Sequence, residues 1–87
     1  MIIDGRELDF PDMVKTEIER ARRLHPQKHN SLHEGYAIIL EEVDEFWDEV
    51  KKKRSEQSPV MILSELVQIG AMAQRISEDV LFEEIEK

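Results

Sequence analysis

Apolar side chains recur along most of the chain at the spacing of an α-helix. The most regular run lies in the middle of the chain, where apolar positions follow each other in steps of four and three, as in the seam of a helical bundle or coiled coil. This seam consists of Leu32, Tyr36, Ile39, Val43, Phe46 and Val50. Ser31, followed three residues later by Glu34, is a capping-box pattern. We therefore expect a helix that begins at Asn30 or Ser31 and ends at about Arg54.

A first helix is expected over residues 11–24. Asp9 is a suitable N-cap, and Pro11 falls in the first turn, where proline is favoured. The apolar positions of this segment again follow helical spacing: Val14, Ile18 and Ala21. His25 precedes Pro26, and a residue before proline is disfavoured in the helical conformation, so the helix should end there.

A third helix is expected over residues 59–76, and it is apolar nearly all round. A helix without a polar face is buried on several sides, and three helices of an 87-residue chain can hardly surround it. Residues 1–8 predict a loose or strand-like start, and residues 77–87 a helical tail. The tail would turn three apolar residues inward: Val80, Leu81 and Ile85. We expect a single all-α domain over 1–87, an antiparallel bundle of three main helices and this tail, completed by dimerisation.

The composition argues against several classes of protein. Cysteine is absent, which excludes disulfides, thiolate metal sites and cysteine nucleophiles. Twenty acidic residues against 12 basic ones give a net charge of −8, which disfavours a nucleic-acid or anionic-membrane surface. No apolar run approaches the roughly 20 residues of a membrane span, and the acidic start does not resemble a secretory signal. We expect a cytoplasmic protein that binds neither nucleic acid nor membrane.

Acidic side chains concentrate in the second predicted helix, where six acids occur within the nine residues 41–49. One interpretation is a solvated face, in which Lys52 and Lys53, each four positions after an acid, relieve the repulsion between carboxylates. The other interpretation is a divalent-cation site, because three of the acids lie beside the apolar seam and have no such partner. These three acids are Glu41, Glu42 and Glu45.

Glu65 lies within the most apolar predicted helix, where an unpaired carboxylate would be costly. Gln68 follows three residues later on the same face and would orient Glu65 or a bound water. A metal is one natural partner, because Mg²⁺ prefers oxygen ligands from a few carboxylates. The alternative is a hydrogen bond to a buried side chain or an ion pair with a distant Lys or Arg, and the residues themselves leave both open.

Together these two acidic segments resemble the EExxE…ExxD signature of the MazG family of all-α nucleotide pyrophosphohydrolases. The match reads Glu41-Glu42-x-x-Glu45, then nineteen residues, then Glu65-x-x-Gln68. It extends over about residues 30–76 and is closest in character to the short MazG-like proteins of mobile and phage-associated genes.

The resemblance implies an enzyme and a set of metal ligands. In that family four acids hold Mg²⁺ between two antiparallel helices, and water attacks the α–β linkage of a nucleoside triphosphate, giving the monophosphate and pyrophosphate. Such enzymes clear non-standard or excess nucleotides. Carried over, the catalytic and metal-binding residues would be Glu41, Glu42, Glu45 and Glu65, with Gln68 as a weaker ligand of Mg²⁺ or Mn²⁺.

Gln68 departs from the family pattern, because an amide stands where the family has an aspartate and brings no charge. The alternative is therefore a catalytically weakened or inactive MazG-like module that binds nucleotide or metal, or that serves only in oligomerisation. The family also implies a homodimer, or a tetramer built as a dimer of dimers.

Few residues outside the acids are expected to contact a nucleotide. Lys52 would contact phosphate, His33 would reach the nucleotide or the partner subunit, and Trp47 would stack on a base, although the core or an interface is the better interpretation for Trp47. A basic patch in residues 20–28 would bind phosphate or, preferably, pair with the acids of another protomer. This patch consists of Arg20, Arg22, Arg23 and Lys28.

Overall fold

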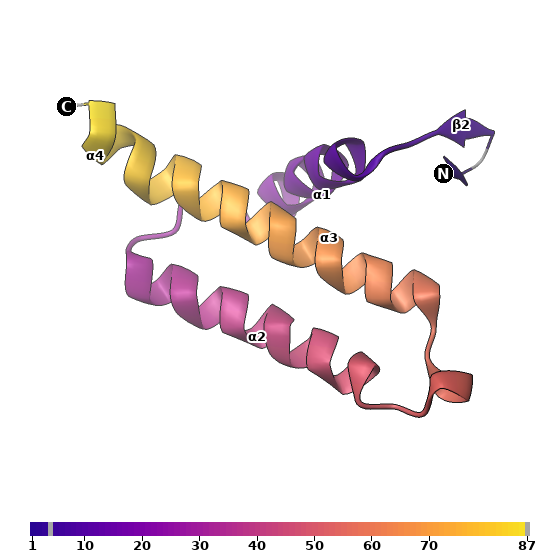
Figure 1. Ribbon diagram of the computed structural model, residues 1–87. Helices are drawn as coiled ribbons and strands as arrows, with labels where there is room; N and C mark the ends of the chain where they lie inside the picture. The colour runs from indigo at the N-terminus through magenta and orange to yellow at the C-terminus, as the bar shows by residue number, and fades with distance from the viewer. Residues whose placement is uncertain (4, 87) are drawn as a thin grey trace.

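A computed structural model describes residues 1–3 and 5–86, and the expected all-α class is confirmed for this part of the chain (Figure 1). The long helices are α1 (Phe10–Leu24), α2 (Leu32–Val50) and α3 (Pro59–Ile76). The shorter helical elements are the 3₁₀ turn η1 (Arg54–Glu56), the π-helical turn η2 (Ser77–Leu81) and α4 (Phe82–Glu86).

The N-terminus forms a small hairpin, as the strand-like start predicted. Strands β1 (Ile2–Ile3) and β2 (Arg6–Glu7) pair antiparallel. Gly5 lies between them with φ of 75°, a backbone conformation that glycine adopts without steric cost. The hairpin extends away from the helices and takes no part in the site described below (Figure 1).

Side-chain caps fix the start of each long helix. The Asp12 backbone N–H donates to the Asp9 carboxylate at 2.9 Å, and the Asp9 backbone N–H donates back to the Asp12 carboxylate, completing a capping box. The Glu34 N–H donates to Ser31 Oγ at 3.1 Å at the start of α2, as expected. Ser58 caps α3 in the same way. These local bonds explain why the predicted starts agree with the structure to within one or two residues.

The end of α2 was predicted wrongly, because the helix stops at Val50 rather than at Arg54. The side-chain amide of Gln57 donates to the carbonyl oxygens of Val50, at 3.0 Å, and Lys52, at 3.3 Å. This side chain satisfies backbone acceptors at the helix end that would otherwise lack a partner. The chain can therefore reverse early, and η1 leads it directly into α3.

Helix α3 packs against the other two long helices. It lies beside α2 and runs antiparallel to it, while α1 crosses α3 (Figure 1). Close approach occurs at two glycines, since a Cβ at Gly35 would lie 2.8 Å from the Ile76 side chain and one at Gly70 would lie 3.1 Å from Val14. The core lies where α1 and α3 meet and consists of Val14, Ile18, Ala21, Val67, Ala71 and Met72.

The predicted seam of α2 is only partly buried. Tyr36 is 69% exposed and Leu32 52% exposed, and Gly35 is the buried residue of this helix. The reason is that α1 packs on α3, so the side of α2 that faces away from α3 has no cover within the described residues. The tail was also predicted wrongly at Ile85, which is 75% exposed on α4. Among the described residues, none of the helices is long and apolar enough to cross a membrane.

Candidate metal centre

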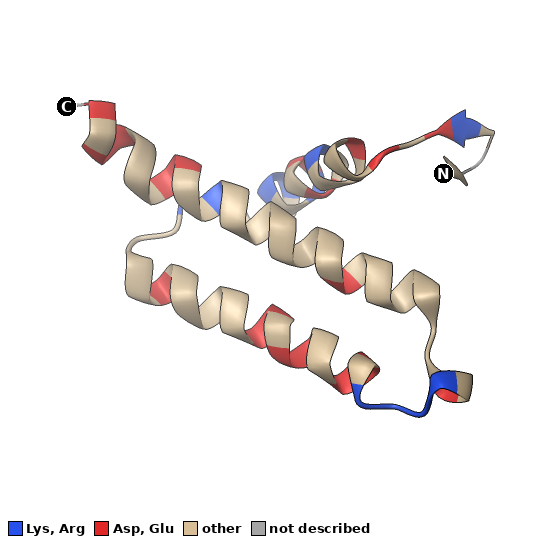
Figure 2. Ribbon diagram, in the orientation of Figure 1, with Lys and Arg blue, Asp and Glu red and all other residues tan. Residues whose placement is uncertain are grey.

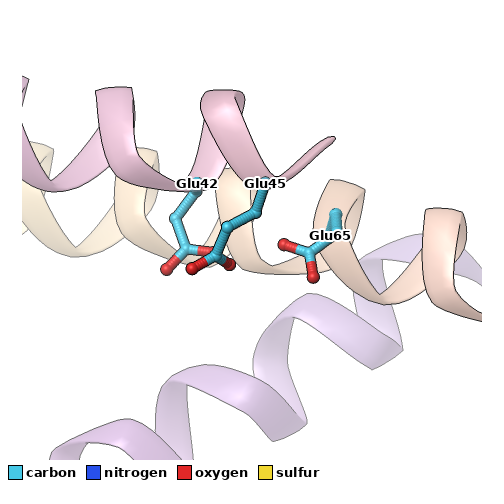
Figure 3. Close-up of side chains that lie close together, drawn as sticks. All are labelled: Glu42, Glu45 and Glu65. Atoms are coloured by element: carbon cyan, nitrogen blue, oxygen red, sulfur yellow. The ribbon is translucent and has the colours of Figure 1, made fainter. Parts of the chain in front are cut away.

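Three carboxylates converge where α2 and α3 lie side by side, two of them from α2 and one from α3 (Figure 3). Glu42 and Glu45 are three positions apart on α2 and therefore share one face of that helix. The antiparallel packing of α3 brings Glu65 to the same place. One carboxylate oxygen from each of the three residues lies within 4.8 Å of the other two. Glu42, Glu45 and Glu65 are called the acidic group below.

Burial and the repulsion of neighbouring carboxylates make it costly to ionise two members of the acidic group, Glu42 and Glu65. Burial, followed by the charges of Glu45 and Glu65, raises the pKa of Glu42 to about 7. Burial likewise raises the pKa of Glu65, and the neighbouring carboxylates of Glu45 and Glu49 add to that increase. In the absence of a cation, the group therefore holds a proton near neutral pH.

Two carboxylate oxygens at this place are buried and accept no hydrogen bond: Glu65 Oε2 and Glu49 Oε2. The other oxygen of Glu49 accepts from Lys52 Nζ at 2.7 Å. The described residues supply no ion pair to Glu42, Glu45 or Glu65 themselves. Figure 2 shows the same imbalance, with acidic positions along the middle of α2 and basic ones only after its end. Several carboxylates with unused oxygens form the kind of donor set that suits Mg²⁺ or Mn²⁺.

The remaining sequence-predicted ligands lie around the acidic group and not within it. Glu41 is exposed on α2, and its charge is one of those that raise the pKa of Glu42. Gln68 lies one turn after Glu65 on α3, but its Nε2 donates to Glu17 Oε1 on α1 at 3.0 Å. The structure therefore brings together three of the four predicted acids, and it joins Gln68 to a residue that the sequence analysis did not single out.

The predicted substrate contacts are dispersed. Lys52 is held by Glu49 at the edge of the acidic group. His33 is exposed near the start of α2, and Trp47 is exposed further along it. The substrate-binding roles of these three side chains stay predictions, because no contact among the described residues brings His33 or Trp47 to the acidic group.

A groove of about 430 Å³ adjoins the acidic group and lies between α1, α3, α2 and the loop before α2. Glu42 is part of its lining on the side of α2, and Glu17 and Arg20 are part of its lining on the side of α1. Apolar side chains, among them Ile38 and Met72, line it between these charged residues. The groove is therefore acidic on the side of α2, carries the ion pair of Glu17 and Arg20 on the side of α1, and has an apolar part.

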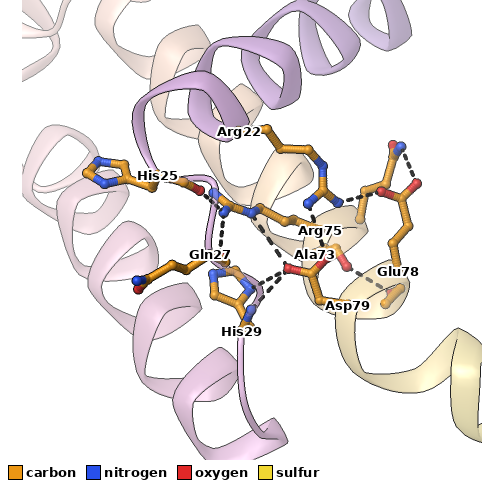
Figure 4. A network of polar contacts seen from close by, with 10 residues as sticks. Arg22, His25, Gln27, His29, Ala73, Arg75, Glu78 and Asp79 are labelled. Atoms are coloured by element: carbon orange, nitrogen blue, oxygen red, sulfur yellow. Dashed lines mark hydrogen bonds and ion pairs between the residues drawn. The ribbon is translucent and has the colours of Figure 1, made fainter.

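Part of the groove lining belongs to a polar network (Figure 4), namely His25, Gln27, His29 and Arg75. Arg75 of α3 is 3% exposed and donates to the backbone carbonyls of His25 and Gln27, which anchors the loop. Asp79 accepts from Arg22 at 3.1 Å and from the His29 backbone N–H at 3.1 Å. Burial alone would raise the pKa of Asp79, but the His29 N–H and the Arg22 guanidinium outweigh it and bring the pKa below its usual range.

Two members of the basic patch, Arg20 and Arg22, thus form ion pairs within the chain, and pairing with another protomer stays a prediction. Arg22 binds Asp79 and Glu78, the latter at 2.9 Å. Arg20 binds Glu17. Sequence reasoning missed all three partners, Glu17, Glu78 and Asp79. Arg20 and Glu17 are three positions apart on α1, a signal that was present but common, whereas the contacts to residues 78 and 79 depend on tertiary packing.

A scan against protein-family models finds no match for this chain, and searches of curated proteins and of solved structures find no significant relative. The resemblance to the MazG family therefore rests on the spacing of the acidic residues.

Proposed function

We propose that this chain is a metal-dependent hydrolase that converts a nucleoside triphosphate to the monophosphate and pyrophosphate. One observation carries the proposal: Glu42, Glu45 and Glu65 converge within 4.8 Å, and none of the three forms an ion pair with a described residue. A folded protein rarely keeps clustered carboxylates partly buried without compensation, because the charged form is penalised by burial and by its neighbours. A divalent cation removes that penalty and adds a function.

Glu42, Glu45 and Glu65 would hold Mg²⁺ or Mn²⁺. When bound, the cation would supply a positive charge that binds phosphate oxygens and stabilises the negative charge of the departing pyrophosphate. We assign Glu49 the role of accepting the proton of the attacking water, since its buried Oε2 has no hydrogen-bond partner and its charge acts on Glu65. The ion pair with Lys52 keeps the Glu49 carboxylate oriented.

The groove supports the nucleoside part of the proposal. Its volume of about 430 Å³ lies in the range typical of small-molecule sites. Ile38 and Met72 offer an apolar surface for a base, while Asn30 and the loop before α2 offer polar groups at the rim. A nucleoside in the groove would place its phosphates beside Glu42.

Homodimerisation belongs to the same proposal. The apolar residues that α2 leaves exposed follow helical spacing on one face: Tyr36, Leu40, Val43 and Trp47. A second copy of the chain is the partner that we propose for this face, as a dimer or as a tetramer of two dimers. Sedimentation at micromolar concentration checks this, and a stable, folded monomer would contradict it.

The activity is tested by pyrophosphate release from canonical and modified nucleoside triphosphates with Mg²⁺ or Mn²⁺. Turnover should disappear in Glu65→Gln and persist in Asp44→Asn, which removes an exposed acid from the other side of α2. Metal alone, at about 100 times its Kd, should stabilise the fold by about 2.7 kcal/mol and raise Tm on the order of 10 °C. The absence of both turnover and metal stabilisation would overturn the proposal.

A second function is favoured by one contact. Gln68 is a neutral amide that adds no charge to the acidic group, and its Nε2 donates to Glu17 instead of facing a ligand there. The alternative is therefore a module that binds metal or nucleotide without turning it over. Metal stabilisation without pyrophosphate release from any substrate would identify this case. In that case Gln68→Asp should tighten Mg²⁺ binding by adding a carboxylate one turn from Glu65.

A further inference from the structure

We propose that Arg20 contacts the phosphates of the bound substrate and that Glu17 is the positioning residue that holds Arg20 in place. The inference rests on the proposed function and identifies the cationic side of the same site. From the sequence, phosphate binding was only the less favoured interpretation of the whole basic patch, and neither Arg20 within the patch nor Glu17 was singled out. The groove between Arg20 on α1 and Glu42 on α2 is the geometric basis.

Glu17 accepts hydrogen bonds from side chains of two helices, Arg20 on α1 and Gln68 on α3. Its side chain is 13% exposed, against 49% for Arg20. Oε2 accepts from Arg20 Nε at 2.9 Å, Oε1 accepts from Arg20 Nη2, and Oε1 also accepts from Gln68 Nε2 at 3.0 Å. The Arg20 hydrogen bond is the main reason that the pKa of Glu17 lies below its usual range, so the carboxylate stays ionised at neutral pH. The two-point contact fixes the plane of the guanidinium.

The guanidinium keeps donors for a ligand. Arginine has five N–H groups, and the contact with Glu17 uses the edge formed by Nε and Nη2. The N–H groups of Nη1 are left to donate to a ligand. The Arg20 side chain is about half exposed and lines the groove. An arginine held by a carboxylate loses less conformational freedom on binding phosphate than a free one, and its fork matches two phosphate oxygens.

The groove has the acidic group on one side and the guanidinium of Arg20 on the other. It therefore suits a ligand that carries both a metal ion and phosphate groups. Glu42 and the acidic group lie toward α2, and Arg20 lies toward α1. Arg75 also lines the groove, but it is buried, its Nη2 donates to two backbone carbonyls of the loop, and its Nε lies 3.7 Å from the carboxylate of Asp79. A metal-bound polyphosphate is the ligand class that can bind the acidic group through its metal and Arg20 through its phosphates.

The test uses the full chain with two separate probes, Mn²⁺ alone and Mg²⁺ with inorganic tripolyphosphate, each measured by calorimetry. Arg20→Gln should bind tripolyphosphate about ten-fold or more weakly, because a charge-assisted contact is lost, while Mn²⁺ binding changes less than about two-fold. The matched control is Arg23→Gln, which removes the same charge from an exposed position of the same helix. It should leave both affinities within about two-fold of the natural chain.

A second variant separates positioning from contact. Glu17→Gln keeps Arg20 but removes the charge that holds it, so KM for the triphosphate should rise several-fold with kcat nearly unchanged and Mn²⁺ binding intact. In the double variant with Arg20→Gln, the Glu17 change should add no further loss, since Glu17 acts through Arg20.

The outcomes are distinct. Equal tripolyphosphate binding by Arg20→Gln and Arg23→Gln would overturn the role of Arg20 and leave the proposed function standing. Additive losses in the double variant would overturn the positioning role of Glu17. Failure of the natural chain to bind Mn²⁺ at all would overturn the proposed function, and the role of Arg20 with it.

Discussion

The carboxylate of Asp79 and those of Glu42 and Glu65 in the acidic group are all at least partly buried, but their surroundings differ. Asp79 is 2% exposed and is contacted by the Arg22 guanidinium, the His29 backbone N–H and, at 3.7 Å, Arg75. The acidic group is less buried, and its neighbours are other carboxylates.

The difference separates two uses of charge in a small helical protein. Around Asp79 the charges are compensated within the chain, so the pKa of the carboxyl is lowered and the contacts hold the loop before α2 onto α3. In the acidic group they are not, so the pKa of Glu42 is raised. A compensated buried charge supports the fold, whereas an uncompensated one reduces stability until a cation arrives from outside.

The largest effect on the free energy of unfolding is expected at Asp79 and its partners. Asp79→Ala removes the acceptor that Arg22, Arg75 and the His29 N–H share, leaving buried positive charge and an unpaired donor. We expect it to lower the free energy of unfolding by about 3 kcal/mol in urea denaturation. Asp44→Asn, an exposed acid on α2, should change it by less than about 0.5 kcal/mol. A loss at Asp79 no larger than that of the control would show that the network does not hold the fold.

In the acidic group, the effect on the free energy of unfolding should be smaller and of opposite sign. Here a carboxylate that is ionised lowers the stability of the metal-free chain, whereas the ionised Asp79 raises it. In the unfolded chain Glu42 loses its proton near pH 4.5, whereas in the folded chain it keeps the proton up to about pH 7. Between these values the folded state binds more protons, so without metal the stability should fall as the pH rises through this window. Because Glu42 is partly exposed, we expect a loss of only about 1 kcal/mol.

Urea denaturation of the natural chain and of Glu42→Gln at pH 5 and pH 7.5, with chelator present, measures this loss. The difference between the two chains should grow with pH in favour of Glu42→Gln, and saturating Mg²⁺ should stabilise the natural chain most at the higher pH. A parallel pH dependence in both chains would show that Glu42 is not the residue that carries the uncompensated charge.

Local signals in the sequence were enough for the helix starts. The caps at Asp9 and Ser31 act within three residues, so they can be recognised without knowledge of the fold. The end of α2 depends on Gln57 reaching back to Val50 from beyond η1, and no helical pattern contains that information. The exposure of Tyr36 follows from which helix α1 packs against, which periodicity does not specify.

The same limit applies to the two charged clusters. Glu42 and Glu45 share a helix face, and the spacing to Glu65 suits a helical hairpin, so their meeting was predictable from the pattern. The contact between Gln68 and Glu17 joins residues 51 positions apart, and Arg75 reaches Gln27 across 48 positions. These contacts arise from the packing of α1 and the following loop on α3, which neither composition nor motif spacing determines.

The smallest effect is expected where the acidic group meets its one nearby cation. Lys52 binds Glu49, whose side chain is 13% exposed, whereas Lys51 binds Asp48, whose side chain is 61% exposed. Both pairs have the same i,i+3 geometry near the end of α2 and differ in burial. Without metal, Lys52→Met should destabilise the chain by about 0.5 kcal/mol, since it leaves Glu49 less compensated beside Glu65, and Lys51→Met should have no measurable effect.

Lys52→Met, which destabilises the chain without metal, should bind metal more tightly than the natural chain. Removing its positive charge makes the acidic group more negative, so Mg²⁺ binding, measured by calorimetry, should tighten by about two- to three-fold, because 0.5 kcal/mol corresponds to that ratio. Lys51→Met should leave the affinity unchanged, since Asp48 is largely solvated and does not act on Glu65. Equal metal affinities of the two variants would place Glu49 and Lys52 outside the metal centre and reduce the uncompensated charge to Glu42, Glu45 and Glu65 alone.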